Sequence, residues 1–237
     1  MSAWDLFESG RFADAILTFS EELEHTPSEG VFNNRGMAYL HLGEFDAALH
    51  DFQSADALSV VQLHTECDGD LRGVALWMAR REREALKTWA DGVKASLAGR
   101  VRYGDAAGGV TIGNLLMFGG VRLDDEATRT LATLYLRKRL RTKQSLAWPG
   151  SASRYLLGKV TEAEMLEAAA SVPILHERQN CQAHFYIGVR KLSARDEAGY
   201  FSAMQKAFEL GSLAKLGAEY YLALHESRQH RREDAQI

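Results

Sequence analysis

The sequence is short of cysteine, of proline and of long apolar runs. Its 237 residues include two cysteines, Cys67 and Cys181, whose wide separation matches no paired metal-binding pattern. Reduced thiols are the ordinary state in the cytoplasm, so a cytoplasmic location is expected. Only three prolines are present, which favours a mostly helical chain because proline breaks helix interiors. No segment reaches the ~20 apolar residues of a membrane span, and the opening MSAWDLFESGRF lacks the basic flank and apolar core of an export signal.

Charge is distributed unevenly along the chain. Residues 1–70 hold 14 Asp and Glu against two Lys and Arg, a net charge of −12, whereas the remaining residues together carry +8. Such an asymmetry can steer a charged partner towards one end of the molecule. The alternative is an unevenly charged surface that is simply solvated.

Two segments 33 residues apart share one pattern of small and aromatic residues. They are ESGRFADAILTF, residues 8–19, and HLGEFDAALHDF, residues 41–52. The matching positions are Gly10 and Gly43, Phe12 and Phe45, Ala15 and Ala48, and Phe19 and Phe52. Small residues such as Gly36 and Ala48 let two antiparallel helices approach closely, and Gly43 suits the left-handed residue that ends a helix. The period and the residue types resemble the tetratricopeptide repeat.

The pattern continues more weakly along the chain. Gly73 and Trp89 lie 37 residues after Gly36 and Phe52, and Gly188 with Met204 marks another pair near the C-terminus. A further helix pair, less regular in sequence, is interrupted near residues 122–124. Thr161 and Glu164 form a capping box, which predicts the start of a helix. The central stretches YGDAAGGV and WPGSASRYLLGKVTEAEMLEAAA resemble bacterial NlpI-like repeat proteins, some of which are encoded near toxins.

The resemblance implies an all-α fold, a right-handed α-solenoid of about five to six helical hairpins. A single domain is expected over residues 1–229, followed by a polar tail, 230–237, that frays. The expected units are 2–30, 31–64, 70–97, 106–143, 149–172 and 178–210, with a capping helix at 212–229.

In tetratricopeptide arrays the first helix of each pair lines a concave groove that binds a protein or peptide. The resemblance places eight residues on that surface: Asn33, Met37, Leu40, Asp70, Val74, Trp77, Phe185 and Val189. The alternative for Trp77 and Phe185 is an ordinary core position. The family's clamp for a C-terminal carboxylate is not predicted, because Trp4, Cys67 and Leu71 stand where it needs Asn, Lys and Arg.

Other motifs offer little chemistry. Gly108 and Gly113 have the spacing of a phosphate-binding loop, but Asn114 and Leu115 replace its Lys and Ser or Thr. The trio His176, Cys181 and His184 lacks a fourth ligand for zinc. The basic run LRKRLRTK, 136–143, could bind phosphates. The simpler interpretation is a solvated helix end, where the helix dipole favours cations. We expect no catalytic residues, no metal and no cofactor.

The sequence therefore predicts a non-enzymatic protein–protein interaction module, a scaffold or adaptor. One alternative is an immunity or inhibitor protein that neutralises a bacterial toxin by covering it with the acidic N-terminal segment. A second alternative is an enzyme or a nucleic-acid binder that uses the basic run at 137–143. Nucleic acid is the less favoured partner, because the run contains leucines rather than aromatic residues that stack on bases.

Overall fold

The computed structural model describes residues 1–61, 69–210, 215 and 217–234, and Cys67 lies outside this part. Among the described residues the chain forms helices and no β-strand, which confirms the all-α class. No helix in this part is long and apolar enough to cross a membrane. The elements in chain order are α1 (Ala3–Glu8), α2 (Phe12–His25), α3 (Glu29–Leu42), α4 (Phe45–Val61), α5 (Gly69–Met78), α6 (Glu82–Leu97), α7 (Thr111–Arg122), α8 (Glu126–Arg139), η1 (Lys143–Leu146), α9 (Gly150–Leu156), α10 (Glu162–Ala170), η2 (Pro173–Leu175), α11 (His176–Ser193), α12 (Glu197–Phe208) and α13 (Ala218–Asp234).

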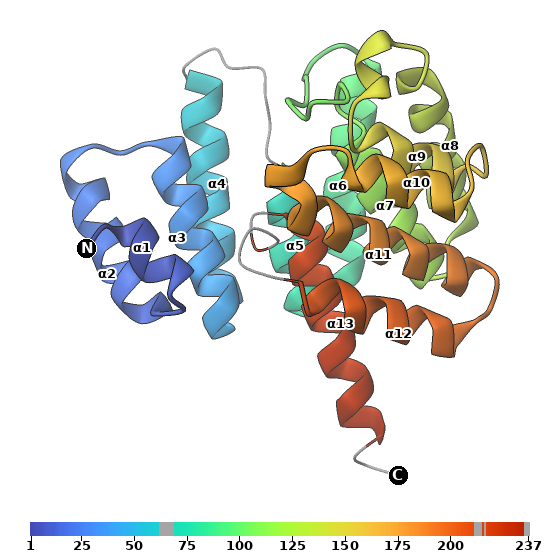
Figure 1. Ribbon diagram of the computed structural model, residues 1–237. Coiled ribbons are helices and arrows are strands. Elements are labelled where there is room, and N and C mark those ends of the chain that lie inside the picture. The colour runs from blue at the N-terminus through green and yellow to red at the C-terminus, as the bar shows by residue number, and fades with distance from the viewer. Residues whose placement is uncertain (62–68, 211–214, 216, 235–237) are drawn as a thin grey trace.

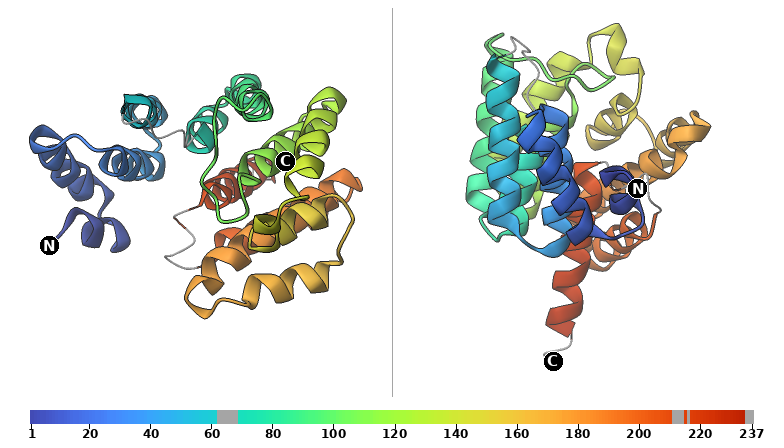
Figure 2. Two further views of the ribbon diagram at one scale, coloured as in Figure 1. Left: turned by 90° about the horizontal axis from the view of Figure 1, so that it is seen from above. Right: turned by 90° about the vertical axis from the view of Figure 1, so that its left-hand side faces the viewer.

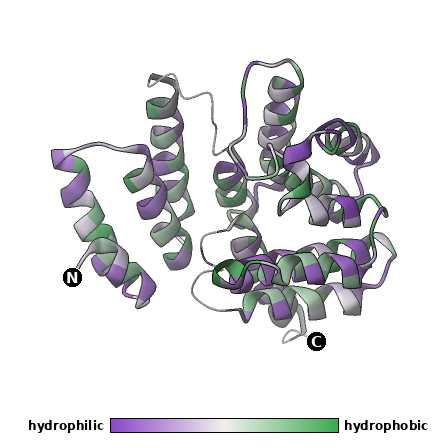
Figure 3. Cartoon of the chain, turned by 45° about the horizontal axis from the view of Figure 1, so that its top comes forward, coloured by the Kyte–Doolittle hydropathy of each residue, from purple (hydrophilic) through white to green (hydrophobic). Residues whose placement is uncertain are grey.

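Consecutive helices pack as pairs, and the pairs stand side by side (Figure 1). The pairs are α1 with α2, α3 with α4, α5 with α6, α7 with α8, α9 with α10, and α11 with α12. The second helix of one pair contacts the first helix of the next at α2–α3, α4–α5 and α6–α7, so these helices form a row. The helices carry both hydrophobic and hydrophilic positions (Figure 3), and a helix such as α2 buries one side, whereas α7 is buried at every residue from 112 to 120.

The glycines of the repeat lie where two helices of a pair come closest. A Cβ built on three of them would stand within 3 Å of a side chain on the second helix: Gly36 against Phe52, Gly73 against Trp89, and Gly188 against Met204. Only a hydrogen fits at these positions without moving the neighbour. Gly43 follows α3 with a φ of 80°, the left-handed conformation predicted for it. The repeat pattern thus located the close approaches correctly.

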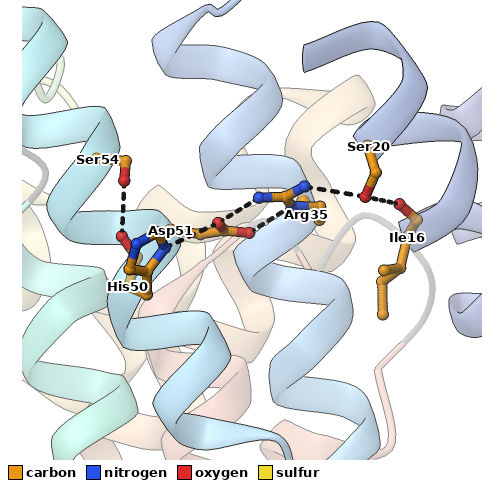
Figure 4. Close-up of polar contacts among 6 residues, drawn as sticks. All are labelled: Ile16, Ser20, Arg35, His50, Asp51 and Ser54. Atoms are coloured by element: carbon orange, nitrogen blue, oxygen red, sulfur yellow. Dashed lines mark hydrogen bonds and ion pairs between the residues drawn. The ribbon is translucent and has the colours of Figure 1, made fainter. Parts of the chain in front are cut away.

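A buried ion pair joins the first three long helices (Figure 4). Arg35 on α3 donates from Nε and Nη2 to the two carboxylate oxygens of Asp51 on α4, at 2.8 and 2.7 Å. Its Nη1 donates to Ser20 Oγ on α2 at 2.9 Å, and Ser20 in turn donates to the Ile16 carbonyl. Because Asp51 is buried and both its oxygens accept hydrogen bonds, this pair holds α2, α3 and α4 in one register.

One helix break and one helix cap agree with the sequence prediction. The chain breaks at 122–124 as expected, with Asp124 at a φ of 49°, and Thr161 and Glu164 form the predicted capping box. The last helix differs from the prediction, because α13 begins at Ala218 and its backbone stays helical to Asp234. The expected frayed tail therefore starts at least five residues too early.

The last helix turns back along the row. It packs against α5 as well as against α11 and α12, although α5 lies far from it in sequence. Seen from above, α13 lies between α5 on one side and the α11–α12 pair on the other (Figure 2). We call the side of the row that faces α13 the inner side.

Candidate functional site

Helix α13 occupies much of the surface that the sequence assigned to a partner. Six of the eight predicted groove residues are buried, none more than 5% exposed: Met37, Leu40, Val74, Trp77, Phe185 and Val189. Met37 still borders a cavity described below, but the expectation of an open groove is wrong for the other five. The other two, Asn33 and Asp70, are partly exposed. The reason is tertiary: a helix of this same chain covers the inner side.

A buried carboxylate fastens α13 to the row. Glu226 accepts hydrogen bonds from Trp77 Nε1 on α5 and from Arg122 Nε on α7, both at 2.9 Å. Burial alone would lower the pKa of Arg122. The adjacent Glu226 raises this pKa by more than burial lowers it, so the pKa of Arg122 lies above its usual value. Arg122 therefore stays charged, and the pair links α13 to two helices that precede it by more than 100 residues.

Trp77 belongs to a continuous aromatic cluster. Its ring lies 5.8 Å from Trp89 and 4.8 Å from Phe118, and Phe118 lies 4.9 Å from Phe185, measured between ring centroids. These contacts join α5, α6, α7 and α11. The cluster makes Trp77 and Phe185 core residues, the alternative that the sequence had left open.

The first turn of α13 carries a second buried carboxylate. Glu219 accepts hydrogen bonds from Tyr186 Oη at 2.5 Å and from Gln182 Nε2 at 3.0 Å, both on α11. Burial, and then Glu219, raises the pKa of Tyr186 well above its usual value, so its hydroxyl stays protonated and donates. Gln182 also accepts a hydrogen bond from Trp148 Nε1 at 2.6 Å. This network fixes Glu219 at the edge of a cavity.

The part of the inner side that α13 leaves open is a cavity of about 420 Å³. Its wall comes from α3, α5, the loop before α7, α11 and the start of α13. We call it the inner cavity, and its lining residues are Glu29, Asn33, Met37, Asp70, Leu71, Tyr103, Gly104, Asp105, Thr111, Ile112, Arg178, Gln182, Gly217, Ala218 and Glu219. Three of the eight predicted site residues meet here: Asn33, Met37 and Asp70.

Acidic groups outnumber basic ones around the inner cavity. Glu29, Asp70, Asp105 and Glu219 supply four carboxylates, and Arg178 is the single lysine or arginine among the described lining residues. Apolar side chains of Met37, Leu71 and Ile112 complete the wall. A cavity of this size, lined by polar and apolar groups in similar proportion, is large enough to hold a side chain or a small ligand.

The loop before α7 is organised by Asp105. Its carboxylate accepts hydrogen bonds from the backbone N–H groups of Ala107, Gly109 and Thr111, at 3.0, 2.9 and 2.8 Å. Gly109 has a φ of 85°, which explains the glycine there. The amides of this glycine-rich loop therefore bind an internal carboxylate, which takes the place that a phosphate would need.

Sequence reasoning missed the C-terminal side of the inner cavity. Arg178, Gln182 and Glu219 belong to no repeat position, so the period could not identify them. One signal was available: the run YYLAL, 220–224, is apolar on all sides, which indicates a fully buried helix rather than a terminal cap. Residues 220–224 are indeed all buried.

A second hollow, with a volume of about 830 Å³, lies between α13 and the turns that end α3 and α5. Two of its arginines have partners on the protein. Arg81 pairs with Glu84 at 2.8 Å and with Asp46 at 3.8 Å, and Arg80 donates to Gln229. Because these contacts already occupy two of its cations, this hollow is a weaker candidate than the inner cavity.

His41 lies in the wall of this second hollow and stacks on Phe12, with 4.0 Å between ring centroids. Burial, followed by Lys215 and Arg228, lowers its pKa from 6.5 to about 3. The unfolded chain therefore binds a proton that the folded chain excludes, so stability is complete above pH 6.5 and falls as the pH falls towards 3.

We expect His41→Phe to reduce the loss of stability between pH 6.5 and pH 4.5 by about 1 to 2 kcal/mol. Phenylalanine keeps the ring stacking and removes the titrating group. Urea unfolding at several pH values measures the effect, with His176→Phe, a change at an exposed histidine, as the matched control. Identical pH profiles for wild type and His41→Phe would contradict the assignment.

The third motif from the sequence, His176, Cys181 and His184, is dispersed. Cys181 is buried, and burial raises the pKa of its thiol, which disfavours the thiolate that binds metal. Across the described residues, no group of three or more His, Cys, Asp or Glu side chains is arranged to hold a metal ion.

Comparison with known proteins identifies no relative: no protein-family model and no curated protein sequence matches the chain.

Proposed function

We propose that this protein is a non-enzymatic interaction module, an α-solenoid of the tetratricopeptide type that binds a polypeptide partner at the inner cavity. The solenoid proposal is supported by the 33-residue repeat, by the close helix approaches at Gly36, Gly73 and Gly188, and by the left-handed Gly43. The binding proposal is carried by one observation, the excess of acidic over basic residues around the inner cavity.

The composition of the inner cavity favours a basic side chain of the partner. A lysine or arginine has an apolar stem, which suits Met37, Leu71 and Ile112, and a cationic end, which suits Asp70 and Glu29.

The proposal is tested with fluorescent peptides that carry one central lysine or arginine in varied flanking sequences. We expect the double variant Glu29→Gln/Asp70→Asn to bind the best such peptide about tenfold more weakly than wild type, because its cationic end loses two carboxylates. Fluorescence anisotropy gives the affinities, and raised salt should weaken wild-type binding.

Glu167→Gln, a neutralisation on the exposed side of α10, is the control and should leave the affinity unchanged. Equal binding of a peptide whose central lysine is replaced by glutamine would contradict the proposed chemistry. Turnover of a bound peptide would contradict the non-enzymatic class.

A further inference from the structure

The row of helix pairs has an uncovered helix face at each of two ends. At one end, α1 has six residues and cannot cover the whole of the fourteen-residue α2. At the other end, α8 packs on α6 and α7, but the main partners of the following helix α9 are α7, α10, α11 and η1. The pair-to-pair packing seen at α2–α3, α4–α5 and α6–α7 is therefore interrupted between α8 and α9, although it recurs at α10–α11. The two helices lie on opposite sides of the molecule (Figure 1).

The uncovered face of α8 is basic around one exposed leucine. Leu134 is 56% exposed, and Arg137, Lys138 and Arg141 follow it on the same side of the chain, all exposed. Arg137 and Arg141 form no ion pair with any described residue, and Lys138 donates only a long hydrogen bond, 3.4 Å, to the Leu97 carbonyl. We call these four residues the α8 face. They border a shallow hollow of about 710 Å³.

The uncovered face of α2 has the opposite charge around its own exposed leucine. Leu17 is 65% exposed, and Glu21 and Glu24 follow it on the same side of the helix, both exposed. Neither glutamate side chain is ion-paired within the described residues. We call Leu17, Glu21 and Glu24 the α2 face.

The two faces match in spacing as well as in charge. On α2 the acids stand four and seven residues after Leu17, and on α8 the bases stand three, four and seven residues after Leu134. At 1.5 Å per residue, the α2 face extends about 10 Å beyond Leu17, whereas α8 ends at Arg139 and Arg141 lies in the turn that follows. Laid parallel with the leucines in contact, Glu21 faces Arg137 and Lys138, and Glu24 points towards the turn that carries Arg141.

Across a pair boundary of the row, a second helix packs on a first helix, as at α2–α3, α4–α5 and α6–α7. A parallel contact between α8 and the α2 of a second copy would join two second helices, so it is a new kind of contact that rests on charge and spacing.

We propose that the α8 face of one copy binds the α2 face of a second copy, so that the protein self-associates head to tail. The partner is this same chain because both complementary surfaces are present on it, at opposite ends. Such a contact is heterologous and leaves one unused face at each end, so copies add into open chains unless the geometry closes a ring. This inference is independent of ligand binding at the inner cavity.

Sedimentation velocity of the full chain tests the proposal, at ~25 mM and at ~500 mM salt, because screening weakens exposed ion pairs. The wild-type average mass should rise with concentration and rise less at high salt. Arg137→Glu/Lys138→Glu and, separately, Glu21→Lys/Glu24→Lys should each weaken association at least tenfold. Leu134→Ser should also weaken it, without any change of charge. All these side chains are exposed, so the fold should be retained.

A mixture separates this contact from a general charge effect. Each doubly reversed variant alone should stay monomeric, whereas a one-to-one mixture of the two should associate, because each then supplies the face that the other lacks. Glu167→Lys, a reversal on α10, should associate like wild type. A wild-type chain that stays monomeric at every concentration overturns the proposal, as does association that neither reversal weakens. Retention of RNA by a monomeric wild type, lost in Arg137→Glu/Lys138→Glu, would overturn it too and assign the α8 face to nucleic acid.

Discussion

Replacing Glu226 with alanine is expected to lower the free energy of unfolding by about 3 kcal/mol. The side chain is buried on α13 and accepts hydrogen bonds from Trp77 Nε1 and Arg122 Nε. Its removal leaves a buried indole donor and a guanidinium without an acceptor. Water can reach part of Arg122, whose side chain is 37% exposed, so the loss falls below that of a fully buried ion pair.

Urea unfolding followed by circular dichroism measures this loss, and hydrogen exchange locates it. The amides of α13 should exchange faster than those of α3 and α4, because the substitution releases α13 first. Glu226→Gln keeps an acceptor for Trp77 and should cost less than Glu226→Ala. Glu197→Ala, at an exposed glutamate in the first turn of α12, should change stability by no more than about 0.5 kcal/mol. A cost below about 1 kcal/mol for Glu226→Ala would show that α13 is held by other contacts.

Gly73→Ala is expected to destabilise the protein by about 2 to 3 kcal/mol, although alanine is the better helix former. A Cβ on Gly73 would stand 2.0 Å from Trp89 Nε1, which itself donates to the Asp70 carbonyl at 3.2 Å. Trp89 is fully buried against Trp77, so it cannot turn away without disturbing the aromatic cluster. The added methyl group therefore forces α5 and α6 apart.

Gly30→Ala is the matched control for this prediction. Gly30 lies in the first turn of α3, and a Cβ built on it meets nothing within 4 Å. The same substitution there should stabilise the protein by about 0.5 kcal/mol, because it only restricts the unfolded chain. Thermal unfolding of both variants should thus shift in opposite directions. Equal shifts would contradict the role of Gly73 as a close-approach position.

Local pattern was sufficient for the helix pairs. Gly36, Gly73 and Gly188 could be assigned to close approaches because a helix pair is made of neighbours in sequence, and its contacts repeat with the period of the chain. Gly43 could be assigned to a turn because a left-handed residue is inexpensive only for glycine. The same logic placed Asn33, Met37 and Asp70 on the inner side, and these three do line the inner cavity.

The sequence by itself thus determined the helical class, the pairing of successive helices and the glycines between them, because these depend on residues a few turns apart. Only the tertiary structure decided what covers the inner side. The contact between Trp77 and Glu226 joins residues 149 positions apart. It forms because α13 packs against α5, which lies far from it in the chain, as well as against α11 and α12. Contacts between such distant segments depend on how all the helices pack together, and no local spacing encodes them.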